Sequence, residues 1–75
     1  MKKDRIIRVR FKQLRKKAGT QDKVGRDNGV TGTMIRYIEN GYVTPSGKLM
    51  LRLSGYFGEP IETLFPDVAE IAKRK

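Results

Sequence analysis

The sequence contains no cysteine and no histidine, and its acidic residues are few. Without cysteine there is no disulfide, no thiolate nucleophile and no cysteine-ligated metal site. Without histidine the chain lacks the usual acid–base group at neutral pH and the commonest metal ligand. No paired carboxylates stand at a useful spacing, and no glycine-rich phosphate loop is present. These absences argue against an enzyme, and they predict a binding protein without a metal, cofactor or small-molecule ligand.

Long apolar runs are absent as well. The N-terminus begins like the basic part of a signal peptide, but Arg8, Arg10 and Lys12 interrupt the apolar segment that would have to follow. No apolar run approaches the roughly 18 residues of a membrane span. The sequence therefore predicts a soluble, cytoplasmic protein.

Positive charge is abundant. The 75 residues include 17 Lys and Arg against 8 Asp and Glu, which gives a formal net charge of +9. This length allows one small domain, which a dimer or a bound partner would help to stabilise. The charge favours an anionic partner, with nucleic acid first and a membrane surface second.

Apolar spacing and capping residues predict five short helices and no strand. The helices begin at Ile7, Thr20, Thr31, Ser46 and Pro60, and they end at Gly19, Gly29, Asn40, Gly58 and Pro66. Their inward-facing residues are predicted to be Ile7, Phe11, Leu14 and Ala18, then Ile35 and Ile38, then Leu49, Met50, Leu53 and Phe57, then Ile61, Leu64 and Phe65. After Pro66, apolar residues stand at a spacing that suits a further short helix, but three cations end the chain, so a disordered tail is equally compatible. The fold class is a compact all-α bundle.

Three segments in this order carry a family resemblance. They are Thr20-Gln21-Asp22-Lys23-Val24-Gly25, Gly29-Val30-Thr31, and Ile35-Arg36-Tyr37-Ile38-Glu39-Asn40-Gly41, followed by Pro45-Ser46. Together they resemble the Cro/C1 (Xre) family of helix-turn-helix DNA-binding domains. The resemblance implies a five-helix, lambda-repressor-like bundle over residues 7–65, in which the second and third helices form the motif. Residues 1–6 would then be a basic arm and residues 66–75 a tail.

The motif has a physical basis in this sequence. The second and third helices must cross closely, and Gly25 supplies the small side chain that such a contact requires. Gly29 permits the positive φ that the turn needs. Val30 precedes the third helix, and Ile35 and Ile38 anchor its buried side. Its opposite side is then free to enter a major groove about 12 Å wide.

Candidate contact residues follow from that geometry and from the resemblance. Gly32, Thr33, Arg36 and Tyr37 are placed on the outward face of the third helix, with Arg36 as the main candidate for bidentate contact with guanine. The resemblance adds Gln21 as a clamp for base edges and phosphate, and it implies phosphate contacts by Thr31, Asn40, Tyr42, Thr44 and Lys48. It also pairs Arg15 with Glu39. This chain departs from the family pattern at Asn28, where a leucine is usual, at Gly32, where many relatives carry a base-reading side chain, and at Gly47 and Tyr56.

Less specific interpretations stay open beside these. Gly25 and Gly29 are also compatible with ordinary helix breakers, Arg36 and Tyr37 with a solvated face, and Gln21 and Asn40 with caps or turns. Arg15 and Glu39 would then form a weak surface pair. Residues 1–17 hold nine cations and one acid, which suits either a solvated helix face or an arm that follows DNA.

The favoured function is a sequence-specific regulator of transcription. It would be a repressor that binds a pseudo-palindromic operator in double-stranded DNA as a homodimer. The 75 residues hold no effector or cleavage domain, and in this they resemble the compact regulators of phages and mobile elements. The alternative is an antitoxin-like interaction module that contacts a protein through its tail and uses DNA binding for autoregulation. A non-specific RNA or membrane binder is disfavoured, because the phenylalanines are expected in the core.

Overall fold

Six helices make up the computed structural model, which describes residues 7–73. They are α1 (Val9–Ala18), α2 (Gln21–Asp27), α3 (Gly32–Glu39), α4 (Gly47–Phe57), α5 (Ile61–Leu64) and α6 (Pro66–Lys73). The described residues contain no strand, so the predicted all-α class is confirmed. The sequence was compatible with either a short helix or a disordered tail after Pro66, and the structure has a sixth helix there. The predicted basic arm, residues 1–6, lies outside the described part of the chain.

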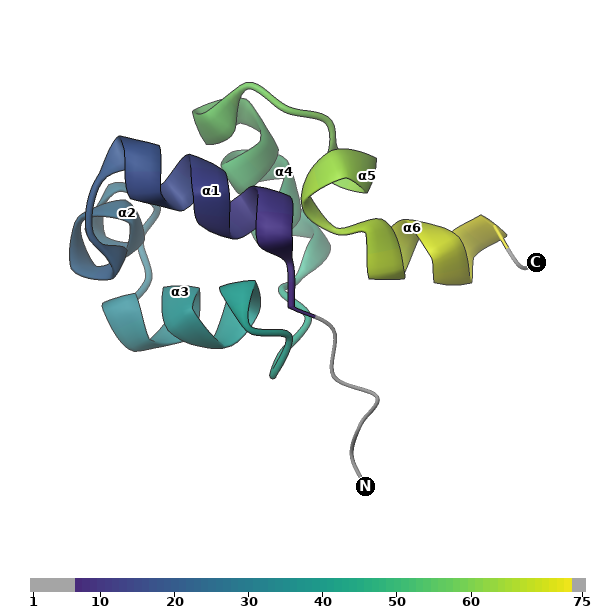
Figure 1. Cartoon of the computed structure of the whole chain (residues 1–75), viewed down its shortest axis with the longest axis horizontal. Coiled ribbons are helices and arrows are strands. Elements are labelled where there is room, and N and C mark those ends of the chain that lie inside the picture. Colours follow the sequence, from purple (N-terminus) through teal and green to yellow (C-terminus); the bar gives the residue numbers. More distant parts are fainter. Residues whose placement is uncertain (1–6, 74–75) are drawn as a thin grey trace.

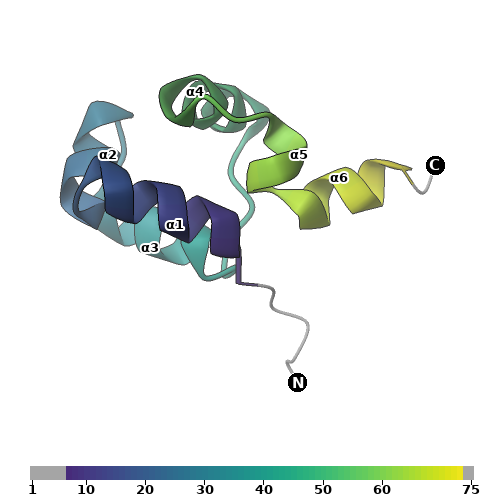
Figure 2. The same ribbon diagram turned by 45° about the horizontal axis from the view of Figure 1, so that its top comes forward.

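α1 lies across the bundle and packs against α2, α3, α4 and α5. α3 runs along one edge of the molecule, with α1 and α2 on its inner side (Figure 1). α6 continues from α5 and extends away from the other helices in both views (Figure 2). No helix among the described residues is long and apolar enough to cross a membrane.

Local capping explains where three of the helices begin. The Thr20 hydroxyl accepts a hydrogen bond from the Lys23 amide, at 3.1 Å. The Thr31 hydroxyl accepts from the Met34 amide at 3.0 Å, and the Ser46 hydroxyl accepts from the Leu49 amide at 3.2 Å. Each bond satisfies an amide that has no partner within its helix. The three predicted caps are therefore confirmed.

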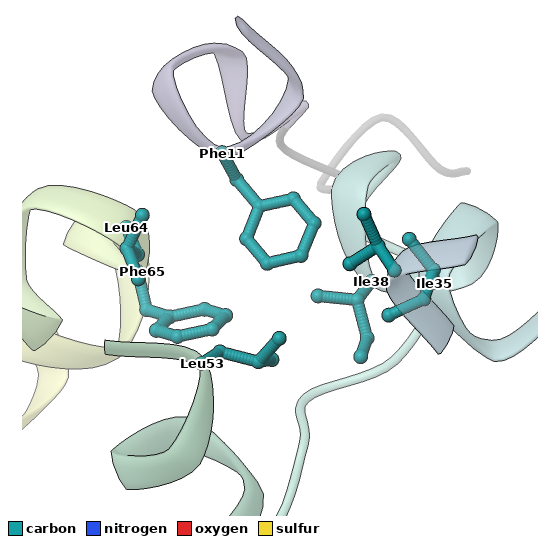
Figure 3. Close-up of a cluster of buried hydrophobic side chains, with 7 residues drawn as sticks. Phe11, Ile35, Ile38, Leu53, Leu64 and Phe65 are labelled. Atoms are coloured by element: carbon teal, nitrogen blue, oxygen red, sulfur yellow. The ribbon is translucent and has the colours of Figure 1, made fainter. Parts of the chain in front are cut away.

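The core consists of seven fully buried apolar side chains from five helices and the residue after α5. They are Phe11, Val24, Ile35, Ile38, Leu53, Leu64 and Phe65 (Figure 3). The Phe11 ring contacts Phe57 edge-on, with 5.3 Å between centroids, and it also meets Phe65 at 5.8 Å. Phe11 thus joins α1 to the C-terminal half of the chain.

The predicted start of the first helix is wrong by two residues. Ile7 was expected on the buried face, but its side chain is 48% exposed and α1 begins at Val9. The residue that turns inward is Arg8, whose side chain is only 2% exposed. The Arg8 amide donates to the Glu39 carbonyl at 2.9 Å, and its backbone is not helical. This tertiary hydrogen bond fixes the chain before α1 and leaves Ile7 facing solvent.

The buried Arg8 guanidinium joins four parts of the fold. It binds the Asp67 carboxylate through Nε at 3.1 Å and Nη2 at 2.8 Å. Its Nη1 donates to the carbonyl of Ile38 at 2.7 Å and to that of Val43 at 2.8 Å. The guanidinium carbon also lies 5.3 Å from the centre of the Phe65 ring. Arg8 therefore connects the end of α3 and the loop after it to the first turn of α6.

Asp67→Asn is expected to destabilise the protein in a pH-dependent way. The hydrogen bonds from Arg8 lower the pKa of Asp67 below its ordinary value. A carboxylate whose pKa is lower in the folded state stabilises at neutral pH, and this contribution is lost as the pH falls through the folded-state pKa. The variant should lose about 1.5–3 kcal/mol at pH 7, and the difference should shrink below about pH 4.

Urea unfolding of both proteins between pH 7 and pH 2.5 measures this effect. Glu62→Gln is the control, because it removes an exposed carboxylate. A free-energy difference between wild type and Asp67→Asn that stays constant over this range would show that the Arg8–Asp67 pair contributes nothing through its charge.

Candidate nucleic-acid interface

Gly25 lies inside α2, is buried, and packs directly against the backbone that leads into α3. A Cβ atom at this position would lie 2.7 Å from the carbonyl carbon and oxygen of Thr31 and 2.7 Å from the Val30 oxygen. All three atoms belong to the backbone, so they have little freedom to move aside. The close crossing of the two helices therefore depends on glycine at this position.

The turn between the two helices uses the backbone freedom of Gly29, whose φ is +76°. The Val30 amide then donates to the Gly25 carbonyl at 2.8 Å, which closes the turn on α2. Asn28 is buried, at a position where the resemblance implies leucine, and its side-chain amide donates to the Val24 carbonyl at 2.8 Å. The Asn28 carbonyl accepts from Arg52 of α4 at 3.0 Å. The first bond satisfies a polar side-chain group that asparagine places in the interior, and the second satisfies a backbone carbonyl.

α3 is amphipathic, and its apolar side faces the core as predicted. Ile35 and Ile38 are fully buried, and Val30 packs against the core just before the helix. Thr33, Arg36 and Tyr37 are exposed on the opposite side. Because α3 lies at the edge of the molecule (Figure 1), these three side chains are open to a large ligand.

Gly32 does not belong to this exposed face, and its predicted position there is wrong. It is buried at the first position of α3. A Cβ atom would collide with the Asp22 carboxylate and would lie 3.0 Å from the Asp22 Cα. Gly32 is the first residue after the Thr31 cap, where α3 passes the first turn of α2. Local sequence patterns do not predict this contact, because Asp22 and Gly32 are ten residues apart.

A buried network joins Arg15, Glu39 and Gln21. The Glu39 carboxylate is 1% exposed and accepts from Arg15 Nε at 2.9 Å and Arg15 Nη2 at 3.1 Å. It also accepts from the side-chain amide of Gln21 at 2.9 Å. The pair that the resemblance implies is therefore present and mostly buried, unlike a weak surface pair. Gln21 is held at the start of α2 by this carboxylate, and its side chain is half-buried.

Of the residues expected to contact phosphate, Thr31 precedes α3 and the other four follow it along the chain. Tyr42, Thr44 and Lys48 are exposed. The Asn40 side-chain amide donates to the Arg36 carbonyl at 2.9 Å, and the Thr31 hydroxyl is engaged in capping α3. Lys48 and Arg52 line a shallow cavity of about 170 Å³ next to the turn at Gly29. Asn40, Tyr42, Thr44 and Lys48 extend from the end of α3 into the first turn of α4.

Sequence reasoning missed an aromatic contact at the end of α3. The rings of Tyr37 and Tyr42 meet edge-on with 5.7 Å between centroids. The guanidinium carbon of Arg36 lies 5.0 Å from the centre of the Tyr37 ring. Tyr42 follows the helix after a turn, so helical spacing from Tyr37 does not predict the contact.

The comparisons with known proteins agree with this geometry. A family model described as helix-turn-helix matches residues 11–64, which is more than half of the chain. No curated protein and no solved structure matches the chain. The matched segment contains the close crossing at Gly25, the turn at Gly29 and the exposed face of α3. The chain belongs to the Cro/C1-type helix-turn-helix family of DNA-binding transcription regulators.

Proposed function

We propose that this protein is a sequence-specific repressor of the phage or mobile-element type. It binds a pseudo-palindromic operator as a homodimer, one α3 helix to each half-site, and blocks transcription by occupying a promoter. The observation that carries this proposal is the exposed face of Thr33, Arg36 and Tyr37 on a helix whose other side is anchored in the core. The net charge of +9 favours binding to the DNA backbone. We also propose a cytoplasmic location for the protein.

The proposed contacts divide into two groups. Thr33, Arg36 and Tyr37 read base edges, and Gln21 contacts DNA from the start of α2, where Glu39 orients its side chain. Tyr42, Thr44 and Lys48, together with the backbone near Thr31 and Asn40, contact phosphates. Phosphate contacts set the register of α3 in the groove, and the base contacts carry the sequence information. Gly32 contributes to helix packing and has no base-reading role in this proposal.

Selection of bound fragments from random duplex DNA tests the proposal directly. A homodimer should select a motif with two-fold symmetry and half-sites about one helical turn apart. The alternative function, an interaction module, assigns α6 to a protein partner, because this helix extends away from the bundle (Figure 2). An antitoxin of that kind would select no operator without its partner. Failure to enrich any sequence would overturn the repressor proposal.

Arg36→Ala should weaken binding to the selected operator far more than binding to random DNA. A bidentate contact with guanine is worth about 1–3 kcal/mol of discrimination, or roughly 5- to 150-fold in affinity. Arg10→Ala is the charge-matched control. The Arg10 side chain binds Glu59, beyond the end of α4, so it points away from α3. Titration of both variants with labelled duplexes measures the effect. Equal losses on the two DNAs for Arg36→Ala would remove Arg36 from base readout.

A further inference from the structure

Arg36, Tyr37 and Tyr42 form a continuous row of exposed side chains, here called the tyrosine row. Arg36 lies over one side of the Tyr37 ring, and Tyr42 meets that ring edge-on. The Tyr42 amide also donates to the Tyr37 carbonyl at 2.9 Å, which fixes the backbone between the two rings. The Tyr37 ring is therefore held from two directions before any ligand binds. Less side-chain conformational entropy is then lost when the ring contacts a ligand.

The tyrosine row combines a charged hydrogen-bond donor with an apolar ring. A guanidinium that rests on an aromatic ring keeps its in-plane N–H groups available, so Arg36 is still able to bind a planar acceptor pair. The Tyr37 ring adds an apolar edge beside it. In the major groove the bases offer one apolar group, the methyl on C5 of a pyrimidine. The 5.0 Å between guanidinium and ring is close enough for them to address neighbouring base pairs, which are about 3.4 Å apart.

We propose that the tyrosine row reads a two-base-pair step. Arg36 binds O6 and N7 of a guanine, and the Tyr37 ring contacts the 5-methyl group of a pyrimidine in the adjacent base pair. Tyr42 positions the Tyr37 ring. The methyl group belongs to thymine or to 5-methylcytosine, because both carry it at the same place in the groove. This inference rests on the proposed function, in which α3 enters the major groove.

The experiment changes only the methyl group of the DNA. Loss of base discrimination in Arg36→Ala first identifies the guanine within the selected operator. Thymine in the adjacent pair is then replaced by uracil, and, in a second set of duplexes, cytosine is compared with 5-methylcytosine at the same position. Removing the methyl should weaken binding about threefold to tenfold in at least one comparison. An effect in the first comparison alone assigns thymine, and an effect in the second alone assigns 5-methylcytosine.

Protein variants connect the methyl effect to the ring. Tyr37→Ala should bind methylated and unmethylated duplexes equally, whereas Tyr37→Phe should keep the preference because it keeps the ring. Tyr42→Ala should reduce the preference. If the protein selects an operator but no methyl changes its affinity, the inference is overturned and the proposed function stands. If no operator is selected at all, the proposed function itself fails. Because the DNA is varied on an unchanged wild-type protein, a folding defect cannot produce either result.

Discussion

Gly25→Leu is expected to abolish cooperative folding or to remove most of the stability of the domain. The new side chain would start from a Cβ atom 2.7 Å from backbone atoms of Val30 and Thr31, so α2 would have to move away from the segment that leads into α3. Overpacking a core typically costs about 1–3 kcal/mol, and more where backbone has to move. A single core of this size supplies about 3–5 kcal/mol in total. Thermal unfolding followed by circular dichroism measures the loss.

Gly55→Leu provides the matched control, because Gly55 also lies inside a helix. A Cβ atom there meets nothing within 4 Å. The substitution should therefore leave the melting temperature unchanged or raise it slightly, since leucine favours a helix over glycine by about 0.8 kcal/mol. The two variants add the same atoms in the same secondary structure. Similar melting temperatures for both would disprove the close crossing at Gly25.

Glu39→Gln is expected to have the second large effect. The substitution preserves shape but removes the charge that binds Arg15, and the Arg15 side chain is 12% exposed. Removing one partner of a buried ion pair typically costs about 3–5 kcal/mol, because the other charge is left buried and uncompensated. The new amide group also brings N–H donors toward the donors of Gln21 and Arg15. Chemical unfolding with urea at neutral pH gives the loss directly.

Two further variants separate the buried charge from charge in general. Asp27→Asn removes an exposed carboxylate that pairs with Lys23, and it should have little effect on stability. Replacing both Arg15 and Glu39 by methionine should recover part of the loss, because no unpaired charge then remains. If Glu39→Gln were no more destabilising than Asp27→Asn, the network around Glu39 would be a surface feature of little energetic weight.

The network also connects stability to the interface. Gln21 is oriented by the same carboxylate that binds Arg15, so α1, α2 and α3 meet at one buried group. Arg8 joins the same end of α3 to α6. The C-terminal end of α3 is thus held by two arginine side chains, Arg15 through Glu39 and Arg8 through the Ile38 carbonyl. A buried arginine requires a full set of acceptors, which only one arrangement of the helices provides.

The starts of three helices were predictable because their causes are local. Thr20, Thr31 and Ser46 each bind an amide three residues ahead, so the sequence alone contains both partners. The turn at Gly29 is local in the same way, because a positive φ is a property of one residue. The buried side of α3 follows from the spacing of Ile35 and Ile38.

The errors arose where a contact spans distant parts of the chain. Arg8 stands in a run of cations for which the sequence suggests either a solvated helix face or an arm that follows DNA, and neither predicts its burial, because its acceptor Asp67 is 59 residues away. Ile7 was placed in the core for the same reason, since apolar spacing does not show where a tertiary bond stops a helix. Gly32 was placed on the exposed face because its contact with Asp22 depends on the crossing of two helices.

The sequence by itself determined the all-α class, the helix-turn-helix motif and the residue types that face outward from α3, because caps, turn glycines and apolar periodicity act over a few residues. Only the tertiary structure decided that Arg8 is buried, that Gln21 is held by Glu39 and that the rings of Tyr37 and Tyr42 meet. These features depend on the angles at which helices cross, and those angles are set by the packing of the whole core.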